Sequence, residues 1–196
     1  MRQALARATR KAARASGGRP VRTENLHVTL AFLGSVPESR VPELAGIGRQ
    51  AAGPWPSLPC SLDLAFDHLE HWRAAQLLCA LPAKPPPAIS ALARRLQDAL
   101  AKGGFAPDLK PFRPHVTVAR KVLRPGPLTG MPPVQWRFIE LALIESRTLP
   151  ALSPVGATGN ASGNGALYSV VESYPLCSDP AGSTAASNAA NNNEKP

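Results

Sequence analysis

The pattern of apolar and polar residues along the chain predicts three helices and several short strands. An Ala-rich stretch and two stretches with apolar residues every three or four positions predict helices at 1–18, 38–52 and 88–102. Alternating or largely apolar runs predict strands at 25–33, 60–66, 75–81, 114–120, 136–146 and 167–172. Only Glu140 interrupts the apolar residues at 138–144, so the strand at 136–146 is expected to be buried on both faces over much of its length.

Two of the predicted strands contain the same short motif. The chain reads N-L-H-V-T-L-A-F-L-G at 25–34 and R-P-H-V-T-V-A-R at 113–120. Successive side chains of a strand point to opposite faces. Each strand therefore shows an imidazole and a hydroxyl on one face: His27 and Thr29 in the first copy, His115 and Thr117 in the second. Phe32 falls on the opposite face from His27 and is expected in the core.

Paired imidazoles and hydroxyls suit acid–base chemistry on a phosphate. A neutral imidazole accepts a proton from an attacking group, and an imidazolium donates one to a leaving oxygen. Both forms are accessible near neutral pH because the unperturbed pKa of His is about 6.5. The hydroxyls of Thr29 and Thr117 are suited to donate hydrogen bonds to phosphoryl oxygens. Arg120 is a candidate for contact with the phosphate or nucleotide, the alternative being a surface Arg at the end of the strand.

With these motifs the chain resembles the two-histidine phosphoesterases, specifically the bacterial RNA 2′,3′-cyclic phosphodiesterases of the 2′-5′ RNA ligase family. The matching stretches are 19–34 and 103–120, with weaker matches at 139–147 and 167–176. The resemblance implies a bilobal α+β fold in which two antiparallel sheets face each other across a central cleft, with helices outside. Members of this family usually begin with an apolar strand before the first helix. That strand is expected to be missing here.

The resemblance also implies an activity, namely hydrolysis of RNA 2′,3′-cyclic phosphate ends to 2′-phosphomonoesters without a metal or other cofactor. By analogy, His115 is the proton acceptor and His27 the proton donor, although the residues alone leave these two roles interchangeable. Thr29 and Thr117 bind the phosphate. The expected partner is RNA or a cyclic-phosphate nucleotide end, and the expected protein is a cytoplasmic monomer.

Composition favours an anionic partner. The chain has 22 Lys and Arg against 13 Asp and Glu, a net charge of +9, and nucleic acid is the first candidate for such a balance. No apolar run is long enough to cross a membrane. His68 and His71 complete no recognised metal-ligand pattern and are interpreted as turn residues. Cys60 and Cys79 lie in strand-like runs, which predicts buried thiols.

Length and complexity suggest one domain with a tail. Residues 1–176 are expected to form a single domain of two pseudo-symmetric lobes. Residues 150–166 are expected to form a flexible hairpin insertion, and 177–196 a disordered low-complexity tail.

Other functions stay open at this point. The same site could catalyse 2′-5′ RNA ligation or act on a small cyclic nucleotide. From a different class, the chain could be a basic RNA-binding module without catalysis, although the presence of both His and both Thr argues against it. A third alternative is the unstable product of a truncated reading frame.

Overall fold

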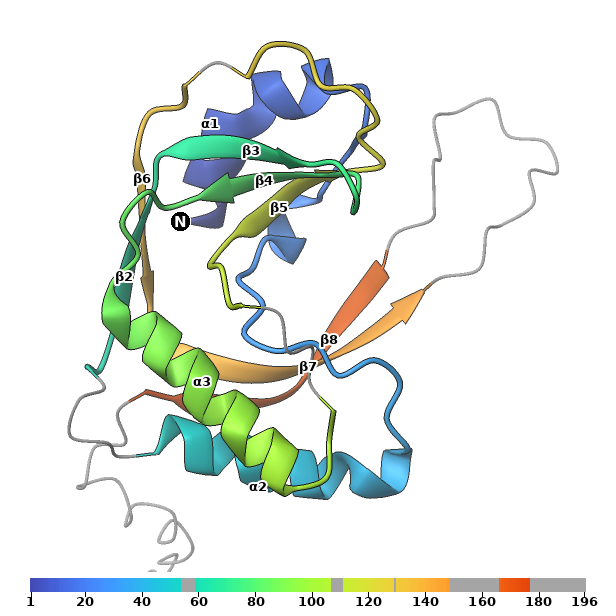
Figure 1. The fold of residues 1–196 in the computed structure, drawn as a ribbon, viewed down its shortest axis with the longest axis vertical. Helices are drawn as coiled ribbons and strands as arrows, with labels where there is room; N and C mark the ends of the chain where they lie inside the picture. The colour runs from blue at the N-terminus through green and yellow to red at the C-terminus, as the bar shows by residue number, and fades with distance from the viewer. Residues whose placement is uncertain (54–58, 107–110, 129, 149–165, 177–196) are drawn as a thin grey trace, which may run out of the picture.

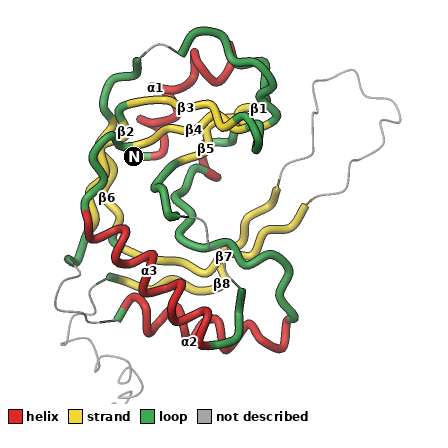
Figure 2. The backbone as a smooth tube through the Cα atoms, viewed as in Figure 1, coloured by secondary structure: helices red, strands yellow, loops and turns green. Residues whose placement is uncertain are grey.

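The computed structural model describes residues 1–53, 59–106, 111–128, 130–148 and 166–176 (Figure 1, Figure 2). Its elements are α1 (Arg2–Ala15), β1 (Arg19–Pro20), the 3₁₀ turns η1 (Thr23–Asn25) and η2 (Glu38–Arg40), α2 (Val41–Ala52), β2 (Leu62–Phe66), β3 (His68–Trp72), β4 (Leu77–Leu81), α3 (Pro87–Lys102), β5 (Val116–Arg120), β6 (Val134–Phe138), β7 (Glu140–Thr148) and β8 (Ala166–Pro175). The described strands pair antiparallel. The predicted α+β class with antiparallel sheets is therefore confirmed. Apart from Ala166, the predicted insertion at 150–166 and the tail at 177–196 lie outside the described residues.

The largest sheet has the strand order β1-β5-β4-β3 and lies with α1 in the upper part of Figure 1. The predicted first helix forms because residues four apart share a helix face, and the buried residues of α1 are Leu5, Thr9 and Ala13. The turn after α1 is tight. A side chain on Gly18 would meet Val122 and the carbonyl of Arg120. Glycine at this position therefore lets β1 pair with the end of β5.

The lower part of Figure 1 holds the two-stranded sheet β7-β8 with α2 and α3. Both helices match the predicted stretches. Proline begins α3 at its first turn, where a missing N–H costs nothing, and Gly103 follows its end. The buried residues of α3 recur at three- and four-residue intervals: Ile89, Leu92, Ala93, Leu96 and Leu100.

The single strand predicted at 136–146 is wrong, because the chain changes partner in the middle of it. β6 pairs with β2 along the left side of Figure 1, and β7 then pairs with β8. Ile139, between them, is 61% exposed, and Ile144 is 40% exposed. Burial on both faces is therefore wrong as well. An apolar run does not reveal which neighbour each part of it will find.

The strand predicted at 25–33 is also wrong over most of its length. Its start is the turn η1, and after it only Val28 makes a β-bridge, to Val116. The chain follows β5 twice, because β1 pairs with Arg120 and Ala119 before η1 loops out. That detour interrupts what would otherwise be one continuous strand beside β5.

The described residues form two hydrophobic cores. The first gathers residues of α1, β2, β4, β5 and β6 around Phe66, Leu78 and Val116. The second lies around α2 and α3 and includes Leu44 and Leu100. Leu30, in the first motif segment, packs against both cores.

The predictions for His68, His71 and the cysteines are confirmed only in part. His68 and His71 lie on β3 rather than in a turn. His71 bonds to the carbonyl of Val122, and the ring of His68 to the side chain of Asp67. Cys79 is a buried free thiol as predicted, whereas Cys60 is exposed and disulfide-bonded, so that prediction is wrong there. No described helix combines the length and apolar character that crossing a bilayer requires.

Candidate active site

The two motif segments lie side by side. Val28 bridges Val116 in an antiparallel pair, and Val116 is fully buried in the first core. This register places His27 opposite Thr117, and Thr29 opposite His115, on the face away from the core. Cβ atoms of directly opposed residues are about 4.5–5.5 Å apart, and diagonal neighbours about 7–8 Å. Extended by one residue on each side of the bridge, this register directs each imidazole toward the hydroxyl of the other motif and makes the two imidazoles diagonal neighbours.

Both imidazoles are held in the same way. His27 Nδ1 lies 2.7 Å from the carbonyl oxygen of Asn25, and His115 Nδ1 lies 2.8 Å from that of Arg113. A carbonyl only accepts, so Nδ1 carries the hydrogen and donates it in each ring. The neutral form then presents the Nε2 lone pair, and the charged form presents an Nε2–H. Nε2 is therefore the atom at which either ring exchanges protons with a substrate.

Each imidazole also contacts an aromatic ring. Trp72 of β3 lies against His115, with ring centroids 4.3 Å apart, and Tyr168 of β8 meets His27 edge-on at 5.3 Å. The pKa of His115 is lowered, chiefly by burial and further by the nearby charges of His27 and Arg113, while its hydrogen bond to the Arg113 carbonyl opposes the shift. Burial beside Trp72 therefore favours the neutral, proton-accepting form of His115.

A β-bulge brings Arg120 to the site. Cys79 pairs with Thr117 but Leu78 pairs with Ala119, so Val118 is an extra residue in β5. The extra residue reverses the alternation beyond it. Ala119 consequently faces the core, where it is fully buried, and does not share the face of Thr117.

Beyond the bulge, Arg120 faces the same side as Thr117 and Cys79. Its Nη2 donates a 3.3 Å hydrogen bond to the hydroxyl of Tyr168, the residue that contacts His27. Arg120 therefore lies on the motif face, next to the aromatic residue that contacts His27.

Two further contacts involve residues beside the motifs, one between Cys79 and Thr117 and one between Arg113 and Glu70. Cys79 is fully buried with Sγ 4.0 Å from Thr117 Oγ1, and burial raises the pKa of its thiol to about 12, so it stays neutral. Arg113 donates to both carboxylate oxygens of Glu70, at 3.2 and 2.6 Å, and this pairing lowers the pKa of Glu70. The pair neutralises the one acidic side chain of β3 on this face, which would otherwise repel a phosphate.

Sequence reasoning missed both aromatic partners and misjudged Phe32. Trp72 and Tyr168 are single aromatic residues far from either motif, and only the sheet register brings them near. Phe32 is 70% exposed rather than in the core, because the segment after Val28 leaves the strand and no longer alternates.

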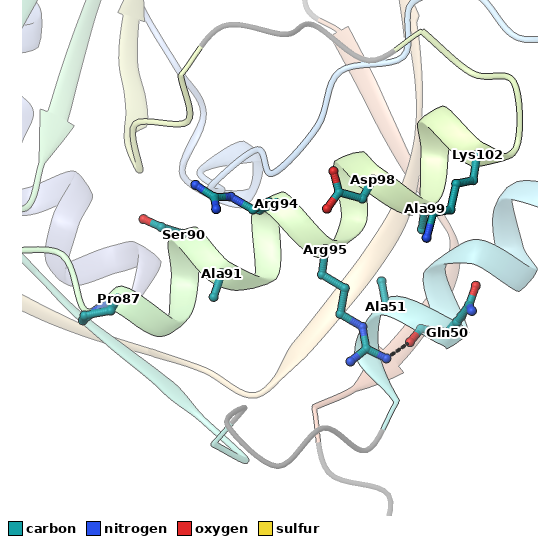
Figure 3. A pocket seen from close by; sticks show the side chains of 10 residues that line it. All are labelled: Gln50, Ala51, Pro87, Ser90, Ala91, Arg94, Arg95, Asp98, Ala99 and Lys102. Atoms are coloured by element: carbon teal, nitrogen blue, oxygen red, sulfur yellow. Dashed lines mark hydrogen bonds between the residues drawn. The ribbon is translucent and has the colours of Figure 1, made fainter.

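Two hollows in the described surface lie elsewhere. Figure 3 shows one between α2 and α3, where Arg95 bonds to the Gln50 carbonyl and Arg94, Asp98 and Lys102 also line the surface. The other lies on α1 between Arg7 and Arg14. Neither contains a motif residue or a His, so neither carries the acid–base pair. Within the described ranges, no three His, Cys, Asp or Glu side chains gather as a metal site.

Comparison with known proteins identifies the family of the chain. A family model described as the 2′-5′ RNA ligase superfamily matches residues 2–148. The chain belongs to this superfamily. It is 31% identical over 179 residues, 87% of its length, to an RNA 2′,3′-cyclic phosphodiesterase of Geobacillus stearothermophilus, and 31% identical over 103 residues, 53% of its length, to one of Escherichia coli. The alignments span 52% and 55% of those relatives, about half of each.

A solved structure shares the fold of this superfamily member. E. coli LigT complexed with 3′-AMP superposes with a TM-score of 0.69 at 23% identity, over 90% of this chain and 91% of that one. The fold predicted from the sequence resemblance is therefore confirmed.

Proposed function

We propose that this protein hydrolyses RNA 2′,3′-cyclic phosphate ends to 2′-phosphomonoesters, using its two histidines as an acid–base pair and no metal ion. The observation that supports this is the antiparallel Val28–Val116 bridge, because its register, continued by one residue each way, pairs each histidine with the threonine of the other motif. The names of the relatives, RNA 2′,3′-cyclic phosphodiesterase, and the 3′-AMP in the LigT neighbour support the substrate class.

His115 acts as the base and His27 as the acid. Neutral His115 takes a proton from water at Nε2 as the water oxygen bonds to phosphorus. The bond from phosphorus to the 3′-oxygen breaks, and the Nε2–H of His27 gives that oxygen its proton, leaving a 3′-hydroxyl and a 2′-phosphate. The lowered pKa of His115 supports this order of roles.

The hydroxyls and Arg120 act on the phosphate. Thr29 and Thr117 donate hydrogen bonds to the non-bridging oxygens, whose charge increases as water attacks. Arg120 adds a positive charge on the same face, and its bond to Tyr168 orients the guanidinium.

The test is hydrolysis of a 2′,3′-cyclic mononucleotide in excess EDTA by the parent and by His27→Ala, His115→Ala and the double variant. We expect the parent to make the 2′-phosphate and each single variant to lose about 10²- to 10⁴-fold in kcat. The double variant should lose little more, because the pair acts as a unit. His68→Ala is the matched control, since His68 lies outside both motifs, on β3, where its ring bonds to the side chain of Asp67.

Several outcomes would contradict parts of this mechanism. Loss of parental activity in EDTA would exclude the metal-free reaction. A 3′-phosphate product would show that the bond from phosphorus to the 2′-oxygen breaks instead of the bond to the 3′-oxygen. A parent that melts cooperatively, binds RNA and shows no turnover would instead support the RNA-binding alternative.

A further inference from the structure

Two arginines lie directly opposite each other where the large sheet meets the site. Arg19 of β1 is the register partner of Arg120 of β5, and both are exposed. Partners in an antiparallel pair share one face, with Cβ atoms about 5 Å apart. Because Arg120 faces the motif side, Arg19 extends from the same face at the sheet edge, where β1 is the outermost strand.

This arrangement carries a cost that folding does not explain. Like charges directly opposite each other in a sheet are destabilising. Among the described residues, neither arginine has a carboxylate partner; Arg120 bonds to the Tyr168 hydroxyl instead. The tight turn at Gly18 holds the two strands at this spacing. An anion between or beside the two guanidinium groups would remove the repulsion.

We infer that Arg19 binds a backbone phosphate of an oligonucleotide whose cyclic end lies against Arg120 and the histidines. This rests on the proposed function and extends it: the preferred substrate is an RNA end with at least one internucleotide phosphate, rather than a free cyclic nucleotide. Arg120 contacts the reacting phosphate, and Arg19 binds the neighbouring one at the sheet edge. The planar guanidinium suits such contact, since it donates two parallel hydrogen bonds to phosphate oxygens.

The cations of α1 are not required for this site. Arg7, Arg10, Lys11 and Arg14 lie on the side of α1 opposite its buried face. That buried face packs on the core side of the sheet, so these cations point away from the motifs. Arg10 therefore serves as a matched control, an exposed arginine that loses the same charge when substituted.

The test compares a 2′,3′-cyclic mononucleotide with a trinucleotide ending in a 2′,3′-cyclic phosphate, using the parent, Arg19→Gln, Arg19→Lys and Arg10→Gln. For Arg19→Gln we expect kcat/KM on the trinucleotide to fall about tenfold, mostly through KM, the effect of one charge-assisted contact. On the mononucleotide, kcat/KM of Arg19→Gln should stay within about twofold of the parental value. The slope of log kcat/KM against log salt for the trinucleotide should flatten by about 0.7. Arg19→Lys should retain most of the preference.

The outcomes separate this inference from the proposed function. If the parent hydrolyses neither substrate, the proposed function fails. If the parent hydrolyses both but Arg19→Gln loses equally on both, or nothing on either, the inference alone is overturned. An equal trinucleotide loss in Arg10→Gln would also overturn it, because general attraction by net charge would then be sufficient. Melting temperatures of all variants check that the fold is kept.

Discussion

The surroundings of Gly18 predict that replacing it by alanine destabilises the protein. A Cβ at this position would lie 2.5 Å from Cγ2 of Val122 and 2.7 Å from the carbonyl oxygen of Arg120. Carbon atoms in contact are normally about 3.5–4.0 Å apart, so the Cβ of Gly18→Ala would lie roughly 1 Å too close to Cγ2 of Val122. The carbonyl belongs to the backbone of β5 and cannot rotate away. Overpacking of this kind costs about 1–3 kcal/mol.

The assay is thermal unfolding followed by circular dichroism. For a chain of this size each kcal/mol shifts the melting temperature by about 2–4 °C, so Gly18→Ala should melt roughly 2–12 °C below the parent. Gly46→Ala is the matched control, because Gly46 lies within α2 and a Cβ there would meet no atom within 4 Å. Replacing glycine by alanine inside a helix stabilises by about 1 kcal/mol, so this variant should melt higher.

The two glycines make the reasoning refutable. If Gly18→Ala melts at or above the parent, the close approach between the first turn and β5 is absent. If Gly46→Ala falls as far as Gly18→Ala, the effect belongs to glycine replacement in general and not to the contact with β5. The melting temperature must fall for Gly18→Ala and rise for Gly46→Ala, although the chemical change is the same.

Two further predictions concern the chemistry. The rate against pH should be bell-shaped, because the two histidines exchange protons as a coupled pair. The acid limb should lie below the ordinary His value of about 6.5, because burial lowers the pKa of His115 and this ring must be neutral to accept a proton. A flat kcat/KM profile, or an acid limb above that value, would refute the assigned roles. Thr29→Val and Thr117→Val should each lower kcat about 10²-fold by removing a donor to the phosphate, whereas Thr9→Val, whose hydroxyl bonds within α1, should leave steady-state turnover unchanged.

The helices could be predicted from the sequence, and the repeated motif could be recognised in it, because both depend on local patterns. The four-residue spacing in α1 and the proline and glycine around α3 act within the element itself. The repeated motif is recognised from the order of its residues alone. The proximity of the two motifs, by contrast, comes from one bridge between Val28 and Val116, which joins segments nearly 90 residues apart in the chain.

What the sequence did not predict comes from interruptions in regular structure. The turn η1 interrupts the predicted strand before the first motif, and the chain leaves the strand again after Val28, which leaves Phe32 exposed. The break at Ile139 divided one apolar run between two sheets. The bulge at Val118 turned Arg120 toward the site against simple alternation. None of these has a local signal, since each depends on which strand lies alongside.

Leu30 has a consequence for motion. It follows Thr29 directly and packs against both hydrophobic cores, so the first motif segment is fastened to both halves of the molecule. A hinge-bending movement that separated the halves would pull on Leu30 and displace the Thr29 hydroxyl with it. The position of the Thr29 hydroxyl is therefore tied to the spacing between the two cores.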